Sequence, residues 1–201
     1  MSDTSQERQI YLDYQATTPV DPKVLDAMLP YFQGHFGNAA SRNHSFGWDA
    51  EKAVDASRKS IAEAIGASAR EIVFTSGATE SNNLAILGIA RMYKPKGQHI
   101  ITCATEHKAI LDPAQYLGKE GWDITILGVD ENGHIDLDEL RSAIREDTVL
   151  VSLMHGNNEI GTIHPIGEIG AICREKGTLF HTDATQTLGK EVVNVQDMNI
   201  D

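Results

Sequence analysis

Residues 99–129 read HIITCATEHKAILDPAQYLGKEGWDITILGV and decide the fold class. The stretch opens with a short β-rich run, HIITCA, and closes with a second one, WDITILGV. Between the two runs, the segment from Lys108 to Lys119 has a helix-like pattern. A strand, a helix and a strand in this order predict a βαβ unit, in which a right-handed crossover joins two parallel strands.

The same alternation continues on both sides of this stretch. Three further β-rich runs predict strands, and they read EIVFTS, TVLVSLMH and GTLFHTDA. Three further helix-like segments separate the runs, and they read TESNNLAILGIARMY, DLDELRSAI and IGEIGAICREK. We therefore expect an α/β fold: a mostly parallel sheet with helices on both faces.

The first third of the chain has a different pattern. Two amphipathic stretches, 22–32 and 46–65, predict helices, and the Gly- and Asn-rich segment GHFGNAASRNHS separates them. A loop of this composition is polar and flexible enough to line a binding site.

Composition and charge narrow the function classes. The chain has 201 residues, of which 41% are hydrophobic and 23% charged, so we expect one sizeable globular core. The formal net charge is −12. Because nucleic-acid binding depends on cationic side chains that neutralise phosphates, and no basic patch occurs, we expect no nucleic-acid partner.

Membrane, disulfide and metal roles lack their usual sequence signals. The first residues, MSDTSQERQIYLDY, have no apolar core of signal-peptide length, and no stretch reaches the ~18 apolar residues that span a bilayer. We therefore expect no membrane association and a cytoplasmic location. Cys103 and Cys173 belong to no CxxC pattern, and the eight histidines include no HExxH pair, so we predict no disulfide framework and no metal site.

Polar residues follow the predicted strands where each strand ends. Ligands of open α/β sheets gather at the carboxyl ends of the strands, so these residues are the candidates for function. In chain order they are Gly77-Ala78-Thr79-Glu80, Thr105-Glu106-His107, Asn157-Asn158-Glu159, and Asp183 with Gln186.

The turn SGATES has two interpretations. Gly77 permits a tight turn, and the helix start that follows offers unpaired N–H groups to a phosphate, to which Thr79 can add its hydroxyl. Alternatively, Ser76 or Thr79 only caps the helix, with Glu80 favourable in the first turn.

Asp183 also has two interpretations. A carboxylate after an apolar strand is partly desolvated and favours a cationic partner, such as the protonated nitrogen of a pyridine ring. Alternatively, Asp183 stabilises the turn DATQT through its own side chain.

Three more side chains fit a ring-shaped ligand. The imidazole of His107 can stack on a cofactor ring and transfer a proton, and the amides of Asn158 and Gln186 can donate to a phenolate-like oxygen. Each alternative is ordinary: a hydrogen-bonded histidine, and amides that satisfy loop backbone groups. Together, the four strand ends match the needs of a phosphorylated pyridine.

A GxGxxG loop and a P-loop, which would indicate dinucleotide or nucleotide binding, are absent from the sequence.

The order of these motifs resembles the cysteine desulfurases, a group of class V pyridoxal-phosphate enzymes that serve iron–sulfur cluster assembly. The matching segments run from Ile10 almost to the last residue, and they read IYLDYQATTPVDP, FGNAASRNHSFG, EIVFTSGATESNNLAI, HIITCATEHKAILD, VSLMHGNNEIGTIHPI and FHTDATQTLGK.

The resemblance implies a role for each candidate toward pyridoxal 5′-phosphate. Ala78 and Thr79 would bind the phosphate, and His107 would stack on the ring. Asp183 would pair with the ring nitrogen, and Asn158 and Gln186 would contact the ring oxygen.

The resemblance also implies how the chain is organised. Residues 1–20 would be a segment that belongs to the small domain of the family, and residues 21–201 an incomplete large domain of the type I pyridoxal-phosphate fold. The family's cofactor-binding lysine lies in a Ser-x-His-Lys stretch shortly after the aspartate strand, and residues 184–201 contain no such stretch. We therefore expect the cofactor cradle here without the lysine or the cysteine that accepts sulfur.

The implied activity converts L-cysteine to L-alanine and leaves the sulfur on the enzyme as a persulfide. The implied partners are a second copy of the chain or a complementary chain, and an iron–sulfur scaffold protein. Two alternatives stay open: another class V reaction, such as that of selenocysteine lyase or an aminotransferase, and a non-catalytic chain that folds only with a complementary chain.

Overall fold

The computed structural model describes residues 9–201. The first eight residues, which begin the expected segment 1–20, lie outside the described part. Two compact units follow one another along the chain, with the boundary between Lys52 and Ala53. Each unit is described by itself.

The first unit contains helix α1 (Pro22–Gln33) and the beginning of α2 (Ser45–Ile65), which confirms the two helices expected there. Asp21 caps α1, because its carboxylate accepts a hydrogen bond from the Lys23 N–H at 2.8 Å. Pro22 then occupies the first helical turn, where its missing N–H leaves no bond unmade.

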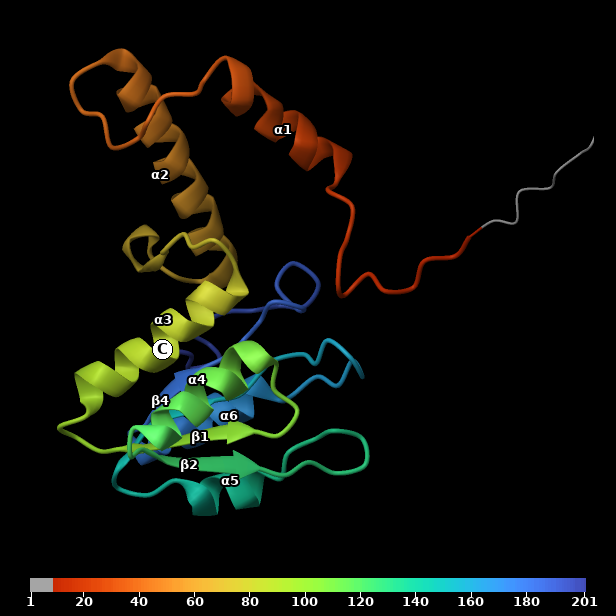
Figure 1. Cartoon of the computed structure of the whole chain (residues 1–201), viewed down its shortest axis with the longest axis vertical. Coiled ribbons are helices and arrows are strands. Elements are labelled where there is room, and N and C mark those ends of the chain that lie inside the picture. The colour runs from red at the N-terminus through yellow and green to blue at the C-terminus, as the bar shows by residue number, and fades with distance from the viewer. Residues whose placement is uncertain (1–8) are drawn as a thin grey trace, which may run out of the picture. The chain divides into compact units, whose positions relative to one another are not determined.

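The second unit is built on a parallel sheet of four strands in the order β2-β1-β3-β4. Figure 1 labels β1, β2 and β4. The strands are β1 (His99–Cys103), β2 (Asp123–Leu127), β3 (Thr148–Ser152) and β4 (Leu179–His181). The helices that follow α2 are α3 (Ala78–Tyr93), α4 (Lys108–Lys119), α5 (Leu137–Ala143) and α6 (Ile166–Lys176). The α/β class is confirmed, and α4 and α6 have the bounds that the sequence pattern predicts.

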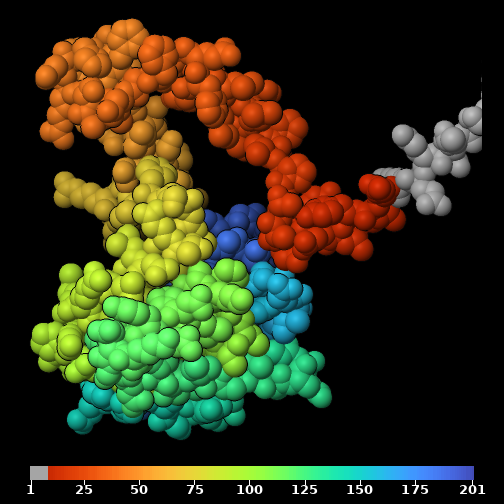
Figure 2. Space-filling model, in the orientation of Figure 1, coloured from red at the N-terminus to blue at the C-terminus, as the bar shows by residue number. Residues whose placement is uncertain are grey.

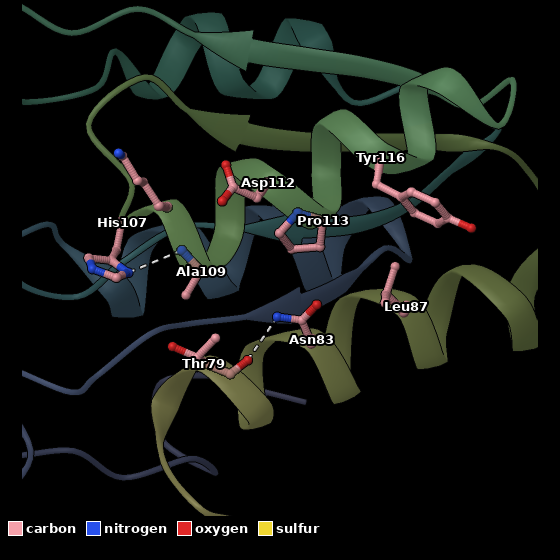
Figure 3. Close-up of a pocket in the computed structure, with 9 residues that line it drawn as sticks. Thr79, Asn83, Leu87, His107, Ala109, Asp112, Pro113 and Tyr116 are labelled. Carbon is pink, nitrogen blue, oxygen red and sulfur yellow. Dashed lines mark hydrogen bonds between the residues drawn. The ribbon is translucent and has the colours of Figure 1, made fainter.

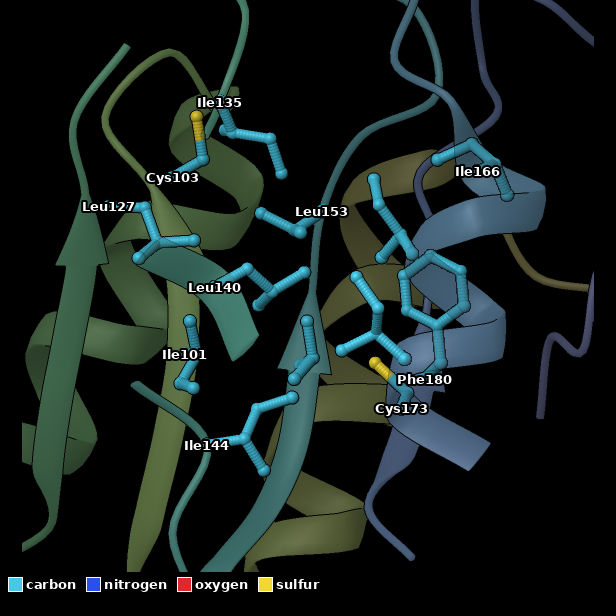
Figure 4. Packing of buried hydrophobic residues seen from close by; sticks show 13 residues of the cluster. Ile101, Cys103, Leu127, Ile135, Leu140, Ile144, Leu153, Ile166, Cys173 and Phe180 are labelled. Atoms are coloured by element: carbon cyan, nitrogen blue, oxygen red, sulfur yellow. The ribbon is translucent and has the colours of Figure 1, made fainter. Parts of the chain in front are cut away.

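Helices cover both faces of this sheet. Because successive side chains of a strand point to opposite faces, Ile100 packs toward α3 and α4, whereas Ile101 packs toward α5 and α6. Figure 4 shows the second cluster, in which Leu140 of α5 and Phe180 of β4 are buried together. Fully burying an aliphatic side chain contributes about 1.5–3 kcal/mol, so these two layers hold the unit together. Helix α4, green in the space-filling view, lies on the surface of the unit (Figure 2).

A buried histidine ties three strands to one another. His99 in the middle strand β1 is fully buried, and its ring nitrogens lie 2.7 Å from Thr148 Oγ1 on β3 and 2.8 Å from Thr125 Oγ1 on β2. Burial lowers the pKa of His99, so the ring is neutral and provides one donor and one acceptor. Both hydroxyl partners satisfy it.

The run EIVFTS does not form a strand, so the prediction for this segment is wrong. Ser68 and Glu71 form a reciprocal capping box that draws 69–71 into a 3₁₀ turn. Ile72 is extended, but its carbonyl accepts a hydrogen bond from the Arg58 guanidinium and not from a neighbouring strand. The ring of Phe74 lies 4.8 Å from that guanidinium carbon, and its side chain is half exposed. Strand propensity gives no strand without a ladder partner.

Two glycines of α6 predict opposite effects of the same substitution. A Cβ at Gly170 would overlap the backbone carbonyl of Met198, whereas a Cβ at Gly167 would meet nothing within 4 Å. Gly170→Ala should lower the free energy of unfolding by roughly 1–3 kcal/mol through overpacking. Gly167→Ala should raise it by about 0.5–1 kcal/mol, because alanine favours the helix. Urea denaturation measures both values, and equal effects of the two changes would contradict this packing.

Candidate functional site

The carboxyl edge of the sheet contains a topological switch between β1 and β3. The chain leaves β1 for α4, on the face that α3 also covers, and leaves β3 for α6, on the opposite face. Such divergence opens a crevice beyond the two strand ends, where open α/β sheets bind their ligands. The residues after β1, β3 and β4 therefore lie at one edge.

Asp183, which follows β4, accepts hydrogen bonds at both carboxylate oxygens. Its Oδ2 accepts a hydrogen bond from Asn82 Nδ2 of α3 at 2.8 Å. Its Oδ1 accepts two from Thr185, one from the backbone N–H at 2.9 Å and one from the hydroxyl at 2.5 Å. Its carbonyl accepts from the His155 N–H at 3.0 Å, which joins the β4 end to the β3 end. The Asn82 bond joins both to α3.

These bonds keep the Asp183 carboxyl ionised. Partial burial raises its pKa, but the hydrogen bonds from Thr185 and Asn82 outweigh burial, and the pKa lies below the ordinary value for aspartate. Asp183 does stabilise its own turn through Thr185, and its pairing with a cationic ring nitrogen stays a prediction. A carboxylate oxygen accepts about two hydrogen bonds, so Oδ2 retains a free acceptor position beside the one that Asn82 uses.

His107 is the N-cap of α4, directly after the β1 end. Its Nδ1 accepts a hydrogen bond from the Ala109 N–H at 3.1 Å, which places the proton of the neutral ring on Nε2. The side chain is otherwise exposed. The ring is thus anchored at one nitrogen and free at the other.

The start of α3 has no side-chain cap. Its N-cap residue is Gly77, and Ser76 instead bonds to Glu80 through its N–H and its hydroxyl, at 2.7 and 2.6 Å. Neither Ser76 nor Thr79 caps the helix, so that interpretation is wrong. Within residues 9–201, the N–H groups of Ala78 and Thr79 have no hydrogen-bond partner. These groups and the positive end of the helix dipole suit an anion.

Thr79 and His107 line the same pocket, an open cavity of about 440 Å³ between α3 and α4. Figure 3 shows the two side chains at one end of this cavity, with Leu87 and Tyr116 toward the other. Ala78, Asn158, Asp183 and Gln186 do not line it.

The two remaining candidates make few contacts of their own. Asn158 donates from Nδ2 to Glu159 Oε1 at 2.9 Å, and the amide of Gln186 makes no hydrogen bond in the described part of the chain. Both are partly buried. Their amides therefore remain available to a ligand, while the neighbouring Asn157 is fully engaged.

Sequence reasoning assigned no role to three polar residues of this edge. Asn82 is a buried amide inside a helix, Glu106 precedes His107, and Asn157 precedes Asn158. Asn82 could have been noticed as a polar residue close to one helical turn after Thr79 and thus on the same side of the helix. Glu106 and Asn157 are marked as candidates by their position after a strand, but the sequence carries no signal for the distant groups that they bind.

Comparison with known proteins identifies the family of the chain. Residues 10–201 match the family described as aminotransferase class-V. The chain belongs to the aminotransferase class V family. It is 58% identical over 192 residues to "Cysteine desulfurase IscS" of Anaeromyxobacter sp. (strain Fw109-5), an alignment that covers 96% of this chain and 48% of the relative. It is 57% identical over 194 residues to the protein of the same name from Histophilus somni (strain 2336), with the same coverage.

Two solved structures share the fold. A "NifS-like protein" superposes with a TM-score of 0.92 at 38% identity, covering 96% of this chain and 54% of the other. "SspA in complex with cysteine" superposes with a TM-score of 0.91 at 42% identity, covering 95% and 55%. The chain spans about half the length of the curated relatives it matches.

Class V proteins and cysteine desulfurases use pyridoxal phosphate, and the residues present fit that group. The unpaired N–H groups at the start of α3 suit its phosphate, and the ionised Asp183 suits a protonated ring nitrogen. The free Nε2 of His107 and the amides of Asn158 and Gln186 supply the remaining polar groups. In residues 9–201, no helix combines the length and the apolar character that crossing a membrane requires.

The Thr185 hydroxyl provides a test of what keeps Asp183 ionised. Thr185→Val removes the hydroxyl bond and keeps the backbone N–H bond, so the pKa of Asp183 should rise toward its ordinary value. A carboxyl group whose pKa is lower in the folded state than in the unfolded state stabilises the protein at pH values above the unfolded pKa, and this stabilisation is lost as the pH falls. The variant should therefore lose less stability than the wild type when the solution is acidified. Carboxyl ¹³C NMR titration measures the shift.

Asp130 serves as the internal control in the same spectra, because bonds within its own turn lower its pKa. Its titration should not change in Thr185→Val. An Asp183 titration that is also unchanged would show that the hydroxyl bond does not set its charge.

Proposed function

We propose that the protein is a pyridoxal-phosphate-dependent cysteine desulfurase, which converts L-cysteine to L-alanine and keeps the sulfur on the enzyme. The observation that carries the proposal is the ionised Asp183, held by Asn82 and Thr185 at the crevice beyond the strands. Relatives named cysteine desulfurase at 58% and 57% identity, and a related structure in complex with cysteine, support this choice among class V reactions.

Each candidate residue has a defined task in this proposal. Asp183 would accept a hydrogen bond from the protonated ring nitrogen at its free Oδ2 position. The N–H groups of Ala78 and Thr79, with the Thr79 hydroxyl, would bind the phosphate. Asn158 and Gln186 would donate to the ring oxygen, and when bound, the cofactor supplies an electron sink for bond cleavage beside the amino group.

His107 would both position the cofactor ring and exchange protons. Its ring would lie against the cofactor ring, held in orientation by the Ala109 N–H at Nδ1. Nε2 is then the atom at which a proton is held or released, because Nδ1 is already occupied. The anchoring bond thus assigns the two ring nitrogens different roles.

We further propose the partners and the domain layout that the family resemblance implies. Residues 1–20 would join the small domain of the whole protein, and residues 21–201 would form part of its large domain. A second copy or a complementary chain would cover apolar side chains such as Val73 and Phe74, which are 65% and 48% exposed. The sulfur acceptor would be an iron–sulfur scaffold protein, in the cytoplasm.

Binding of an unreactive cofactor analogue tests the cradle. Pyridoxine 5′-phosphate has the ring nitrogen and the phosphate but no aldehyde, so it cannot react with lysine amines. The chain should bind it saturably in isothermal titration calorimetry, and Asp183→Asn should weaken binding tenfold or more, since a bond to a charged group contributes about 1.5–3 kcal/mol. The matched control Asp197→Asn, an exposed aspartate, should bind as the wild type does. Equal affinities of all three proteins would remove the basis of the proposal.

Catalysis by the 201-residue chain should be weak. Residues 184–201 contain no Ser-x-His-Lys stretch, which the resemblance requires for the cofactor-binding lysine. With added pyridoxal phosphate and L-cysteine, the chain should release alanine far more slowly than a full-length cysteine desulfurase assayed beside it. Turnover comparable to that of the full-length enzyme would sink this prediction.

A further inference from the structure

Two hydrogen bonds join the loop after β1 to the end of β3. Asn157 Nδ2 donates to the Thr105 carbonyl at 2.8 Å, and the Met154 N–H donates to Glu106 Oε1 at 2.6 Å. One bond thus runs in each direction across the switch between the two strands. The loop leads directly to His107, and the β3 end leads directly to Asn158.

Glu106 makes its bond from an unusual position for a glutamate. Its side chain is only 6% exposed, and Oε2 is buried without a hydrogen-bond partner among residues 9–201. A buried carboxylate with an unsatisfied oxygen is costly, whereas a neutral acid loses much less on burial. Burial accordingly raises the pKa of Glu106 to about 8 against the opposing bond from Met154, and the negative charge of Asp183 adds to the rise.

The proposed function gives this buried acid a purpose, and the role inferred for Glu106 rests on that function. We propose that Glu106 is a positioning residue: its buried carboxyl group fixes the loop that carries His107 to the strand end that leads to Asn158. The distance between His107, which would stack on the cofactor ring, and Asn158, which would contact the ring oxygen, is then fixed. Glu106 touches neither the ligand nor the reacting atoms, and acts through the Met154 amide.

The positioning role of Glu106 also depends on its carboxyl group being neutral. The groups that couple to its charge are Asp183 after β4 and the thiol of Cys103 on β1, and both become anions when they ionise. An ionised Glu106 would therefore place a second negative charge beside Asp183. It would also favour water entry at Oε2, which would loosen the loop.

The first test needs no cofactor and compares Glu106→Gln with Glu106→Ala. Glutamine keeps an oxygen for the Met154 N–H and a second polar group in place of the acid hydroxyl, so it should preserve the bond. Alanine removes the bond. Amide hydrogen exchange at Met154 should accelerate at least tenfold in Glu106→Ala and less than threefold in Glu106→Gln, and the NMR signals of the His107 ring should shift in the alanine variant only. Glu131→Gln, at an exposed site, controls for removal of a charge.

The second test uses pH and remains valid where Glu106→Ala fails to fold. Because the folded pKa of Glu106 lies above the unfolded one, the native state holds an extra proton between about pH 4.5 and 8, and stability falls as pH rises through this window. Relative to Glu106→Gln, the wild type should lose up to tenfold in its folding constant per pH unit there. If the stabilities of the wild type and of Glu106→Gln depend equally on pH, Glu106 is not a neutral acid in the folded protein.

Binding of pyridoxine 5′-phosphate at pH 7 tests whether the bond between Glu106 and Met154 affects the cofactor cradle. Glu106→Gln should bind within twofold of the wild type, and Glu106→Ala about tenfold more weakly. Wild-type affinity in Glu106→Ala, together with unchanged Met154 exchange, contradicts the positioning role. If no protein binds the analogue while Met154 exchange and the His107 signals change as expected, the proposed function fails and the loop-fixing role of Glu106 stands.

Discussion

The parallel pairing of β1 with β3 is the contact on which the rest of the second unit depends. It sets His99 opposite Thr148, so that one buried imidazole satisfies hydroxyls on both neighbouring strands. It also brings together two strand ends from which the chain departs to opposite faces of the sheet, and a crevice at that point follows from topology alone. The site therefore depends first on strand order, and only then on the side chains at the strand ends.

Much of the fold could be predicted from the sequence because its signal is local. Buried strands such as HIITC and TVLVS and helices such as α6 carry their apolar periodicity within a dozen residues. The strand predicted for EIVFTS was wrong because a strand forms only where a second segment pairs with it through backbone hydrogen bonds. Its backbone carbonyl at Ile72 is satisfied by Arg58, a side chain 14 residues earlier, and apolar content alone did not indicate that competitor.

The candidate site divides along the same line. Strand-end reasoning selected Asp183 and His107, since position after a strand is readable in sequence order, whereas Thr79 was selected after a run, EIVFTS, that forms no strand. The supporting hydrogen bonds were not readable, because Asn82 lies 101 residues from Asp183 and Glu106 lies 48 residues from Met154. A hydrogen bond between residues far apart in the chain has no local sequence pattern, so a polar residue after a strand is easier to select than the residue that holds it in place.

Two acids at one edge of the sheet differ in charge because their hydrogen bonds differ. Asp183 accepts bonds from Asn82 and twice from Thr185, which favours the ionised form, whereas Glu106 accepts one bond and is otherwise sealed from solvent. Environments that push two pKa values apart give two carboxyl groups different tasks. With Glu106 neutral, the two acids present one negative charge to the crevice. One negative charge complements a ring that carries one protonated nitrogen, whereas two would bind that nitrogen more tightly at the cost of repelling the phosphate of the same ligand.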